Sequence, residues 1–276
     1  MRLGLALAAL LVASGASAEP MVFDNGRLFI PARINGAPTE ALLDSGAETT
    51  VLTPQLAAKA KLPGGQAIMI KGSGGSAPAH LVEGAEVDAL GVTLHPEAVV
   101  IMDLSDISKR LVKRPLAMIL GREIFDSARL RVDIAGRAVG VVPKDSAPPG
   151  TKLSLTGHAG IESIPVTLNG KPAQAEFDLG NGSGVLISRA YADRLHLKTI
   201  GQRSGGGIGG KLMRDLVRID ALEVAGRTFR DVEAAVDDQP NGNDLNIGTS
   251  ILKNFLITTD FAARSVWLAP IGGERG

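Results

Sequence analysis

Short apolar runs separated by Gly, Pro, Asn and Asp make up most of the chain. Runs of about four to eight residues bounded by such turn residues are typical of β-strands. The clearest of them are residues 27–34, 40–43, 67–70, 97–102 and 130–134. The pattern therefore predicts a protein built mainly of strands.

Turns and helices can be placed along the same pattern. Asn35-Gly36 and Asn169-Gly170 each stand between two apolar runs, and an Asn-Gly pair accepts the positive φ angles of a tight hairpin turn. Residues 53–62 and 188–195 predict one helix in each half, and each segment begins with a Thr or Ser suited to capping a helix.

The pattern also occurs twice. Residues of the first half recur 134 positions later, and the pairs are Ile30-Pro31 with Ile164-Pro165, Asn35-Gly36 with Asn169-Gly170, Pro38 with Pro172, and Val51-Leu52 with Val185-Leu186. Near the end of each half the spacing is shorter, since Ile119-Leu120-Gly121 matches Asn246-Ile247-Gly248; the missing residues fall in the loop that corresponds to residues 102–115. Two copies of a unit too small to bury its apolar face alone pack about a pseudo-two-fold axis. We therefore expect an all-β fold of two closed-barrel lobes with pseudo-two-fold symmetry and one or two short helices per lobe.

The ends and the middle of the chain suggest its boundaries. Residues 1–18 contain Arg2, an apolar run and the small residues Ala16-Ser17-Ala18, which is the layout of a secretory signal peptide cleaved after Ala18. No later apolar run approaches the roughly 20 residues of a membrane span. We expect a first lobe at 19–143, a linker at 144–152, a second lobe at 153–276, and a periplasmic or secreted location.

The amino-acid composition argues against several kinds of functional site. Lys and Arg balance Asp and Glu at 29 each, so no basic surface for nucleic acid is expected. The four histidines are scattered and Cys is absent, which argues against a metal site and removes the common thiol nucleophile. No Gly-x-Ser-x-Gly motif is present. We expect no cofactor, and carboxylate chemistry remains.

Two aspartates stand in phase with the repeat. Asp44-Ser45-Gly46 and Asp178-Leu179-Gly180 each close a similar apolar strand. If the halves pack about a two-fold axis, the carboxyl groups meet, and carboxyls about 3 Å apart share one proton. The ionised member can then activate water while the protonated one polarises a carbonyl. Glycine at Gly46 and Gly180 permits close approach of the two loops, and the Ser45 hydroxyl can brace the opposite loop.

Residues 42–49 (Leu-Leu-Asp-Ser-Gly-Ala-Glu-Thr), followed by Val51-Leu52 and by Ile119-Leu120-Gly121-Arg122, resemble the aspartic proteases of the retropepsin type. The second half resembles a diverged copy, so the chain is similar to a covalently joined retropepsin dimer or a small bacterial relative of pepsin. The resemblance implies the two-lobed aspartic protease fold, with Asp44 and Asp178 as the catalytic pair and Ser45, Gly46, Leu179 and Gly180 as its supporting loops.

The same resemblance implies two flaps. The Gly-rich segments 71–76 and 205–210 lie at the repeat spacing and would be mobile hairpin tips that close over an extended polypeptide substrate. The implied substrate-binding residues are Gly72, Ser73, Gly74, Gly75, Gly206, Gly207, Ile208 and Gly209. We expect a monomer that is an intramolecular pseudo-dimer.

Departures from the family pattern keep three functions open. Leu179 replaces the usual Thr or Ser, Asn181 replaces a small residue, and the only Tyr, Tyr191, lies in a predicted helix rather than a flap. Our first hypothesis is an exported aspartic endopeptidase, with a mildly acidic optimum because Ala47 stands where pepsins carry a hydroxyl. The alternative is a catalytically impaired pseudoprotease that binds peptides, and the third is a two-lobed β scaffold with an unrelated envelope role.

Overall fold

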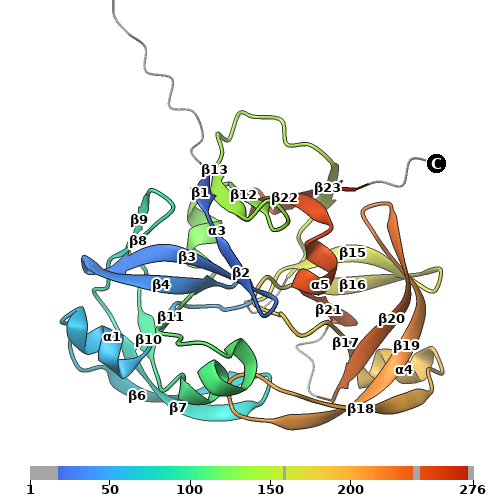
Figure 1. Cartoon of the computed structure of the whole chain (residues 1–276), viewed down its shortest axis with the longest axis horizontal. Coiled ribbons are helices and arrows are strands. Elements are labelled where there is room, and N and C mark those ends of the chain that lie inside the picture. Colours follow the sequence, from blue (N-terminus) through green and yellow to red (C-terminus); the bar gives the residue numbers. More distant parts are fainter. Residues whose placement is uncertain (1–17, 158–159, 239–242, 273–276) are drawn as a thin grey trace, which may run out of the picture.

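The computed structural model describes residues 18–157, 160–238 and 243–272, which form two β lobes side by side (Figure 1). The signal peptide predicted at residues 1–18 lies outside the described residues except for Ala18. Within the described ranges, every helix is too short or too polar to cross a membrane.

The first lobe is built on one large sheet in the order β6-β7-β10-β5-β11-β4-β3-β8-β9, with β2 paired to β3. Its strands are β2 (Val22–Asp24), β3 (Arg27–Ile34), β4 (Ala37–Leu43), β5 (Val51–Leu52), β6 (Gln66–Gly72), β7 (Gly75–Val82), β8 (Val87–Ala89), β9 (Val92–Leu94), β10 (Val99–Ile101) and β11 (Met118–Leu120). Its helices are α1 (Pro54–Lys59), α2 (Ser105–Ile107), the π-helix η1 (Ser108–Val112) and α3 (Glu123–Ser127).

The second lobe repeats this plan in the order β15-β16-β21-β17-β20-β19-β18. Its strands are β15 (Ser163–Leu168), β16 (Lys171–Phe177), β17 (Val185–Ser188), β18 (Thr199–Gly205), β19 (Leu212–Val224), β20 (Arg227–Asp237) and β21 (Leu245–Ile247), and its helices are α4 (Arg189–Arg194) and α5 (Thr249–Leu252). In both lobes a late strand, β11 or β21, pairs parallel with one early strand and antiparallel with the next.

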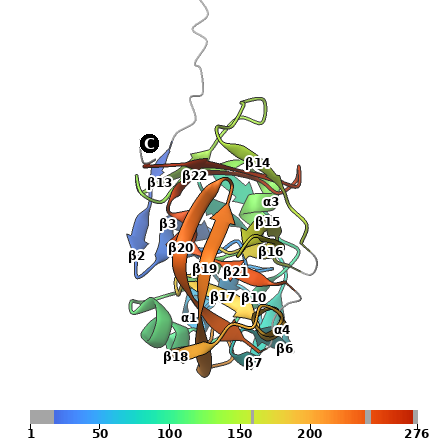
Figure 2. The same cartoon turned by 90° about the vertical axis from the view of Figure 1, so that its right-hand side faces the viewer.

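A third sheet joins the lobes, with six strands in the order β1-β13-β12-β22-β23-β14. These strands are β1 (Glu19–Pro20), β12 (Leu130–Asp133), β13 (Ala138–Val141), β14 (Thr151–Ser154), β22 (Phe255–Asp260) and β23 (Ser265–Pro270). At its centre Leu130 pairs with Thr259 and Val132 with Ile257, which are the pairings that a two-fold axis through β12 and β22 requires. Figures 1 and 2 show this sheet at one end of the molecule and the β6–β7 and β18–β19 hairpins at the other. The two-lobed, all-β fold with pseudo-two-fold symmetry is therefore as predicted.

Local sequence explains the hairpins and helix starts. Asn35 and Gly36 have φ angles of 46° and 75°, and Asn169 and Gly170 have 46° and 76°, so both predicted turns use positive φ at both positions. The helix predicted at 53–62 is α1, where the Thr53 hydroxyl accepts a hydrogen bond from the amide of Leu56. Ser188 caps α4 in the same way.

A continuous hydrophobic core runs through both lobes and beneath the joining sheet. Strand β3 shows how it is built, since most of its side chains are buried and only Pro31 and Arg33 face solvent. Between the lobes, the rings of Phe125 and Phe261 stack with their centroids 5.2 Å apart. The chain has no cysteine and therefore no disulfide. Burial of apolar side chains holds one lobe against the other.

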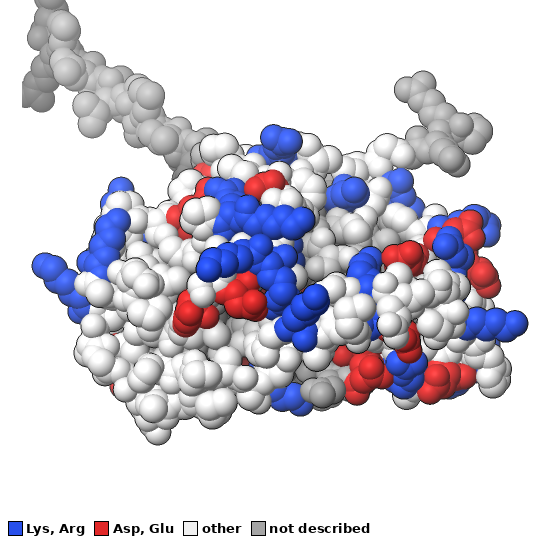
Figure 3. Space-filling model, turned by 60° about the horizontal axis from the view of Figure 1, so that its bottom comes forward, with Lys and Arg blue, Asp and Glu red and all other residues white. Residues whose placement is uncertain are grey.

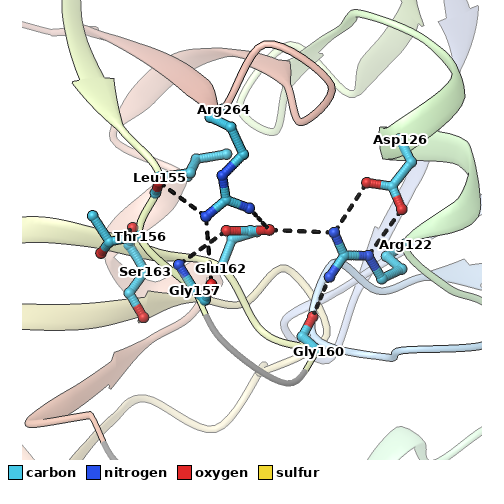
Figure 4. Close-up of polar contacts among 9 residues, drawn as sticks. All are labelled: Arg122, Asp126, Leu155, Thr156, Gly157, Gly160, Glu162, Ser163 and Arg264. Atoms are coloured by element: carbon cyan, nitrogen blue, oxygen red, sulfur yellow. Dashed lines mark hydrogen bonds and ion pairs between the residues drawn. The ribbon is translucent and has the colours of Figure 1, made fainter.

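An ion cluster around one buried carboxylate also connects the lobes (Figure 4). Glu162, at the start of the second lobe, is 1% exposed. Its carboxylate accepts hydrogen bonds from Arg264 and from Arg122 of the first lobe, the latter at 3.2 Å. Arg122 also pairs with Asp126 and donates to the carbonyl of Gly160 at 3.0 Å. A buried carboxylate needs such partners, so Arg122 finds an acidic partner in each lobe.

Candidate active site

Each aspartate of the repeat sits where three strands converge. Asp44 follows β4 and Asp178 follows β16. The Asp44 amide donates to the carbonyl of Leu120 at 3.0 Å, and the Asp178 amide donates to that of Ile247 at 3.1 Å. Strands β11 and β21 thus hold the two loops in equivalent positions.

The two loops face each other at van der Waals distance. A Cβ added to Gly46 would lie 2.9 Å from the carboxyl carbon of Asp178, and one added to Gly180 would collide with the carboxyl group of Asp44. A side chain at either position would therefore displace the opposite carboxylate. The structure brings Asp44, Gly46, Asp178 and Gly180 close together.

Ser45 braces the opposite loop. Its hydroxyl donates to the carbonyl of Phe177 at 2.9 Å and accepts from the amide of Leu179 at 3.0 Å. The reciprocal side-chain bond is missing, because Leu179 carries no hydroxyl; that side chain is fully buried in the core instead. The connection between the loops is therefore polar on one side and apolar on the other.

The two carboxylates have unequal hydrogen-bond partners. Asp44 Oδ1 accepts from the amide of Gly46 at 2.8 Å. Asp178 Oδ1 accepts from the amides of Gly180 and Asn181 at 2.9 and 3.0 Å, and its Oδ2 accepts from the side chain of Asn246 at 2.8 Å. The second lobe thus supplies more donors to its aspartate than the first.

The predicted flap tips touch each other. They lie in the β6–β7 hairpin, which carries Gly72 to Gly75, and in the β18–β19 hairpin, which carries Gly206 to Gly209. The Gly74 amide donates to the carbonyl of Ile208 at 2.8 Å. The Ile208 side chain packs on an apolar cluster of the first lobe, and so does Ala47 of the first Asp loop. Both hairpins therefore meet at the end of the molecule opposite the joining sheet (Figures 1 and 2).

The lower face of the molecule differs between the lobes (Figure 3). Its lower left is largely uncharged, and the β6–β7 hairpin there carries one Lys, Lys71, and no acidic residue. Over the second lobe, at the right, acidic and basic side chains alternate. Ion pairs of the second lobe include Arg189 with Asp215 and Arg203 with Glu233.

Comparison with protein families identifies a family for this chain. The model of the family described as aspartyl protease matches residues 30–124 and again residues 164–251. The chain belongs to the aspartyl protease family. Comparison with curated proteins returns no match. The two matched regions of this aspartyl protease are the two halves of the repeat, and each contains one Asp loop.

The electrostatics of the aspartyl protease favour one shared proton. Burial raises the pKa of Asp44, and the negative charge of Asp178 raises it further, to about 7, against the pull of the Gly46 and Ala47 amides. Burial also raises the pKa of Asp178, which its bonds from Asn246, Asn181 and Gly180 oppose. Two carboxyls in such surroundings therefore hold one proton between them until the pH rises to about 7, the pKa of Asp44.

Arg27 lies close to both aspartates, and the sequence analysis gave it no role. It is 6% exposed, and its guanidinium donates to the carbonyls of Asn25 and Leu111 at 2.9 and 3.1 Å. Burial lowers the pKa of Arg27 while Asp44 and Asp178 raise it. In return its positive charge lowers the pKa of each aspartate.

A helical insertion reaches from the first lobe to the β18–β19 hairpin of the second. Residues 102–115 were interpreted from the sequence as a loop, but residues 105–112 within it form α2 and η1. Arg110 of η1 donates to three successive carbonyls of the predicted flap, those of Gly205, Gly206 and Gly207, at 3.0 to 3.3 Å. The helical spacing of Leu104, Ile107 and Leu111 was the signal for this element, and these side chains join the apolar cluster beneath the flap tips.

The sequence pattern revealed no function for two further residues near the aspartates, Asn246 and Glu176. Asn246 was recognised as a member of the repeat without a function, and Glu176 was not singled out. Both are buried, at 7% and 6% exposure. The sequence did contain a signal for them: Asn246 stands where the first half has Ile119, and Glu176 stands where it has Leu42, so each replaces an apolar residue by a polar one. Among the described residues no cluster of three or more His, Asp or Glu is arranged to bind a metal ion.

Proposed function

We propose that this aspartyl protease is an exported endopeptidase that hydrolyses peptide bonds with a water activated by Asp44 and Asp178. The observation that carries the proposal is the approach of the two loops, in which Gly46 faces the carboxyl group of Asp178 and Gly180 faces that of Asp44. Export, to the periplasm or beyond, is supported by the signal-like residues 1–18.

The unequal surroundings of the aspartates suggest how the reaction proceeds. Ionised Asp178 takes a proton from the water molecule, and the water oxygen bonds to the carbonyl carbon of the substrate. At the same time protonated Asp44 gives its proton to the carbonyl oxygen. The resulting tetrahedral diol collapses when Asp178 passes the proton to the amide nitrogen and the C–N bond breaks. A diol proton returns to Asp44, so the enzyme is restored and water has been added across the bond.

The hairpins support an extended polypeptide as the substrate. Their Gly-rich tips present backbone N–H and C=O groups, which pair with an extended chain as an added strand would. Gly72 to Gly75 and Gly206 to Gly209 touch one another here, so they must separate before a chain can enter.

The test is cleavage of a diverse peptide library by the mature protein between pH 3 and pH 8. Asp44→Asn and Asp178→Asn should each abolish cleavage while retaining the fold. Asp145→Asn, at an exposed position in the predicted linker, is the matched control and should cleave normally. Full activity in either dyad variant would refute the mechanism. Peptide binding by the folded wild type without turnover at any pH would instead identify the impaired, peptide-binding alternative.

A further inference from the structure

The two lobes differ at one pair of adjacent strand positions beside the dyad. In the first lobe Leu42 of β4 pairs with Ile119 of β11, and both are buried in an apolar cluster. At the equivalent register in the second lobe, Glu176 of β16 pairs with Asn246 of β21. Burying polar groups costs stability that an apolar pair avoids. The second lobe therefore keeps a costly pair where the first lobe shows that an apolar pair fits.

Hydrogen bonds fix the orientation of the Asn246 amide. The backbone amide of Ser183 donates to Asn181 Oδ1, and the carbonyl of Gly184 accepts from Asn181 Nδ2. Since a backbone N–H only donates and a carbonyl only accepts, the Asn181 amide has one possible orientation. Its Nδ2 also donates to Asn246 Oδ1 at 2.6 Å. Asn246 must therefore point its Nδ2 away from Asn181, towards the carboxylates.

The two hydrogens of Asn246 Nδ2 reach two carboxylates. One bond goes to Glu176 Oε2 at 2.9 Å and the other to Asp178 Oδ2 at 2.8 Å. With the backbone amides of Gly180 and Asn181 on Oδ1, both oxygens of Asp178 face N–H donors. These donors stabilise the ionised form of Asp178. If Asp178 were protonated, its O–H group would face only N–H donors and would lack an acceptor.

The charges around this pair come from several elements. Asp178 faces Asp44 of the opposite loop and Arg27 of β3, besides Glu176. Glu176 faces Asp178, the Asn243 side chain at 3.2 Å and Asp237 of β20. Burial raises the pKa of Glu176, and the Asn246 and Asn243 bonds lower it. Arg214 pairs with Asp237 at 3.4 Å.

We propose that Asn246 and Glu176 are positioning residues that make Asp178 the general base and leave the shared proton on Asp44, an inference that rests on the proposed peptidase function. Glu176 holds one hydrogen of the Asn246 amide and thereby directs the other at Asp178. The dyad then has fixed, unequal roles, and the difference lies outside the two Asp loops.

The test copies the first lobe into the second. The double variant Glu176→Leu with Asn246→Ile reproduces the Leu42–Ile119 pair, so both buried polar side chains are removed together. Asp178 Oδ2 loses its donor, Asp178 Oδ1 keeps the amides of Gly180 and Asn181, and Asn181 Nδ2 keeps its bond to the carbonyl of Gly184. We expect the acid limb of its kcat profile to move up by about 1 pH unit, because a charge-assisted hydrogen bond to the base is lost. At pH values below the pKa that defines this limb, kcat of the variant should be about tenfold lower than kcat of the wild type, while KM is unchanged. The control Asn243→Ala removes the other side-chain bond to Glu176, leaves the Asp178 contacts intact, and should keep the wild-type profile.

A second readout keeps this inference separate from the proposed function. The carboxyl carbons of Asp44 and Asp178, labelled with ¹³C, are titrated by NMR in the wild type and in the double variant. We expect Asp178 to ionise first in the wild type and its midpoint to rise in the variant. Unchanged midpoints in a folded variant would overturn the inference even if the wild type cleaves peptides. A wild type that cleaves nothing would refute the peptidase, while the NMR titration would still decide the roles of Asn246 and Glu176.

Discussion

Replacing Asp44 by Asn should stabilise the protein at neutral and alkaline pH. The pKa of Asp44 is raised from 3.8 to about 7 by burial and by the charge of Asp178. An acid with a raised pKa binds its proton more tightly in the folded state, so its contribution to stability is present at low pH and is lost as pH rises from about 4 to about 7. At 1.36 kcal/mol per pH unit, a shift of about three units corresponds to about 4 kcal/mol at most. Asn has the same shape, still accepts the Gly46 amide bond and does not ionise.

The assay is urea unfolding of the wild type and Asp44→Asn from pH 4 to pH 8, followed by fluorescence of the single Trp, Trp267, and by circular dichroism. The stability of the variant minus that of the wild type should grow by up to about 4 kcal/mol between pH 4 and pH 8. Asp145→Asn should show no such growth. A difference for Asp44→Asn that stays constant over this range would refute the reasoning, because it would show that the carboxyl group titrates alike in the folded and unfolded chains.

Four further outcomes follow from the structure. Peptide cleavage should decline above about pH 7, because Asp44 must be protonated and its pKa is about 7; a rate that keeps rising to pH 9 would contradict this. Ser45→Ala should lower the free energy of unfolding by about 1–3 kcal/mol, since it leaves a buried carbonyl and a buried amide without partners, and a loss below measurement error would count against the brace. Arg110→Ala should speed hydrogen exchange in residues 205–212 about tenfold through loss of its flap carbonyl bonds; Arg110→Lys should restore part of the protection, and equal exchange in all three proteins would show that η1 does not restrain the flap. Glu162→Gln should cost about 3 kcal/mol of unfolding free energy, because Arg122 and Arg264 lose a buried ionised partner, and a cost below about 1 kcal/mol would indicate that the cluster is dispensable.

The repeat in the sequence predicts the fold because its spacing survives in residues that backbone geometry requires. Asn35-Gly36 and Asn169-Gly170 are needed for positive φ, and Gly46 and Gly180 for the close approach of the loops. These positions tolerate few other residues, so their pattern predicts the structure directly. The positions of both aspartates follow from that symmetry.

Sequence reasoning fails where the halves differ. The bonds of Asn246 depend on the amide orientation of Asn181, which only the folded loop defines. Arg110 reaches the flap of the other lobe across 95 to 97 positions of the chain, with no counterpart in the repeat to reveal it. Such contacts depend on how elements from two lobes are packed, and local propensity carries no information about them.

Because β12 and β22 belong to one chain, the meeting of the two Asp loops does not depend on protein concentration. When two separate subunits must each supply one aspartate, dilution separates the pair, and stability depends on subunit concentration. Here both aspartates belong to one chain, so their encounter is unimolecular, with the high effective concentration of a tethered partner. Because the two halves are joined in one chain, their sequences can differ from each other. A buried Glu176 and Asn246 can therefore arise in one copy alone, whereas in a symmetric homodimer any such substitution would appear at both aspartates at once.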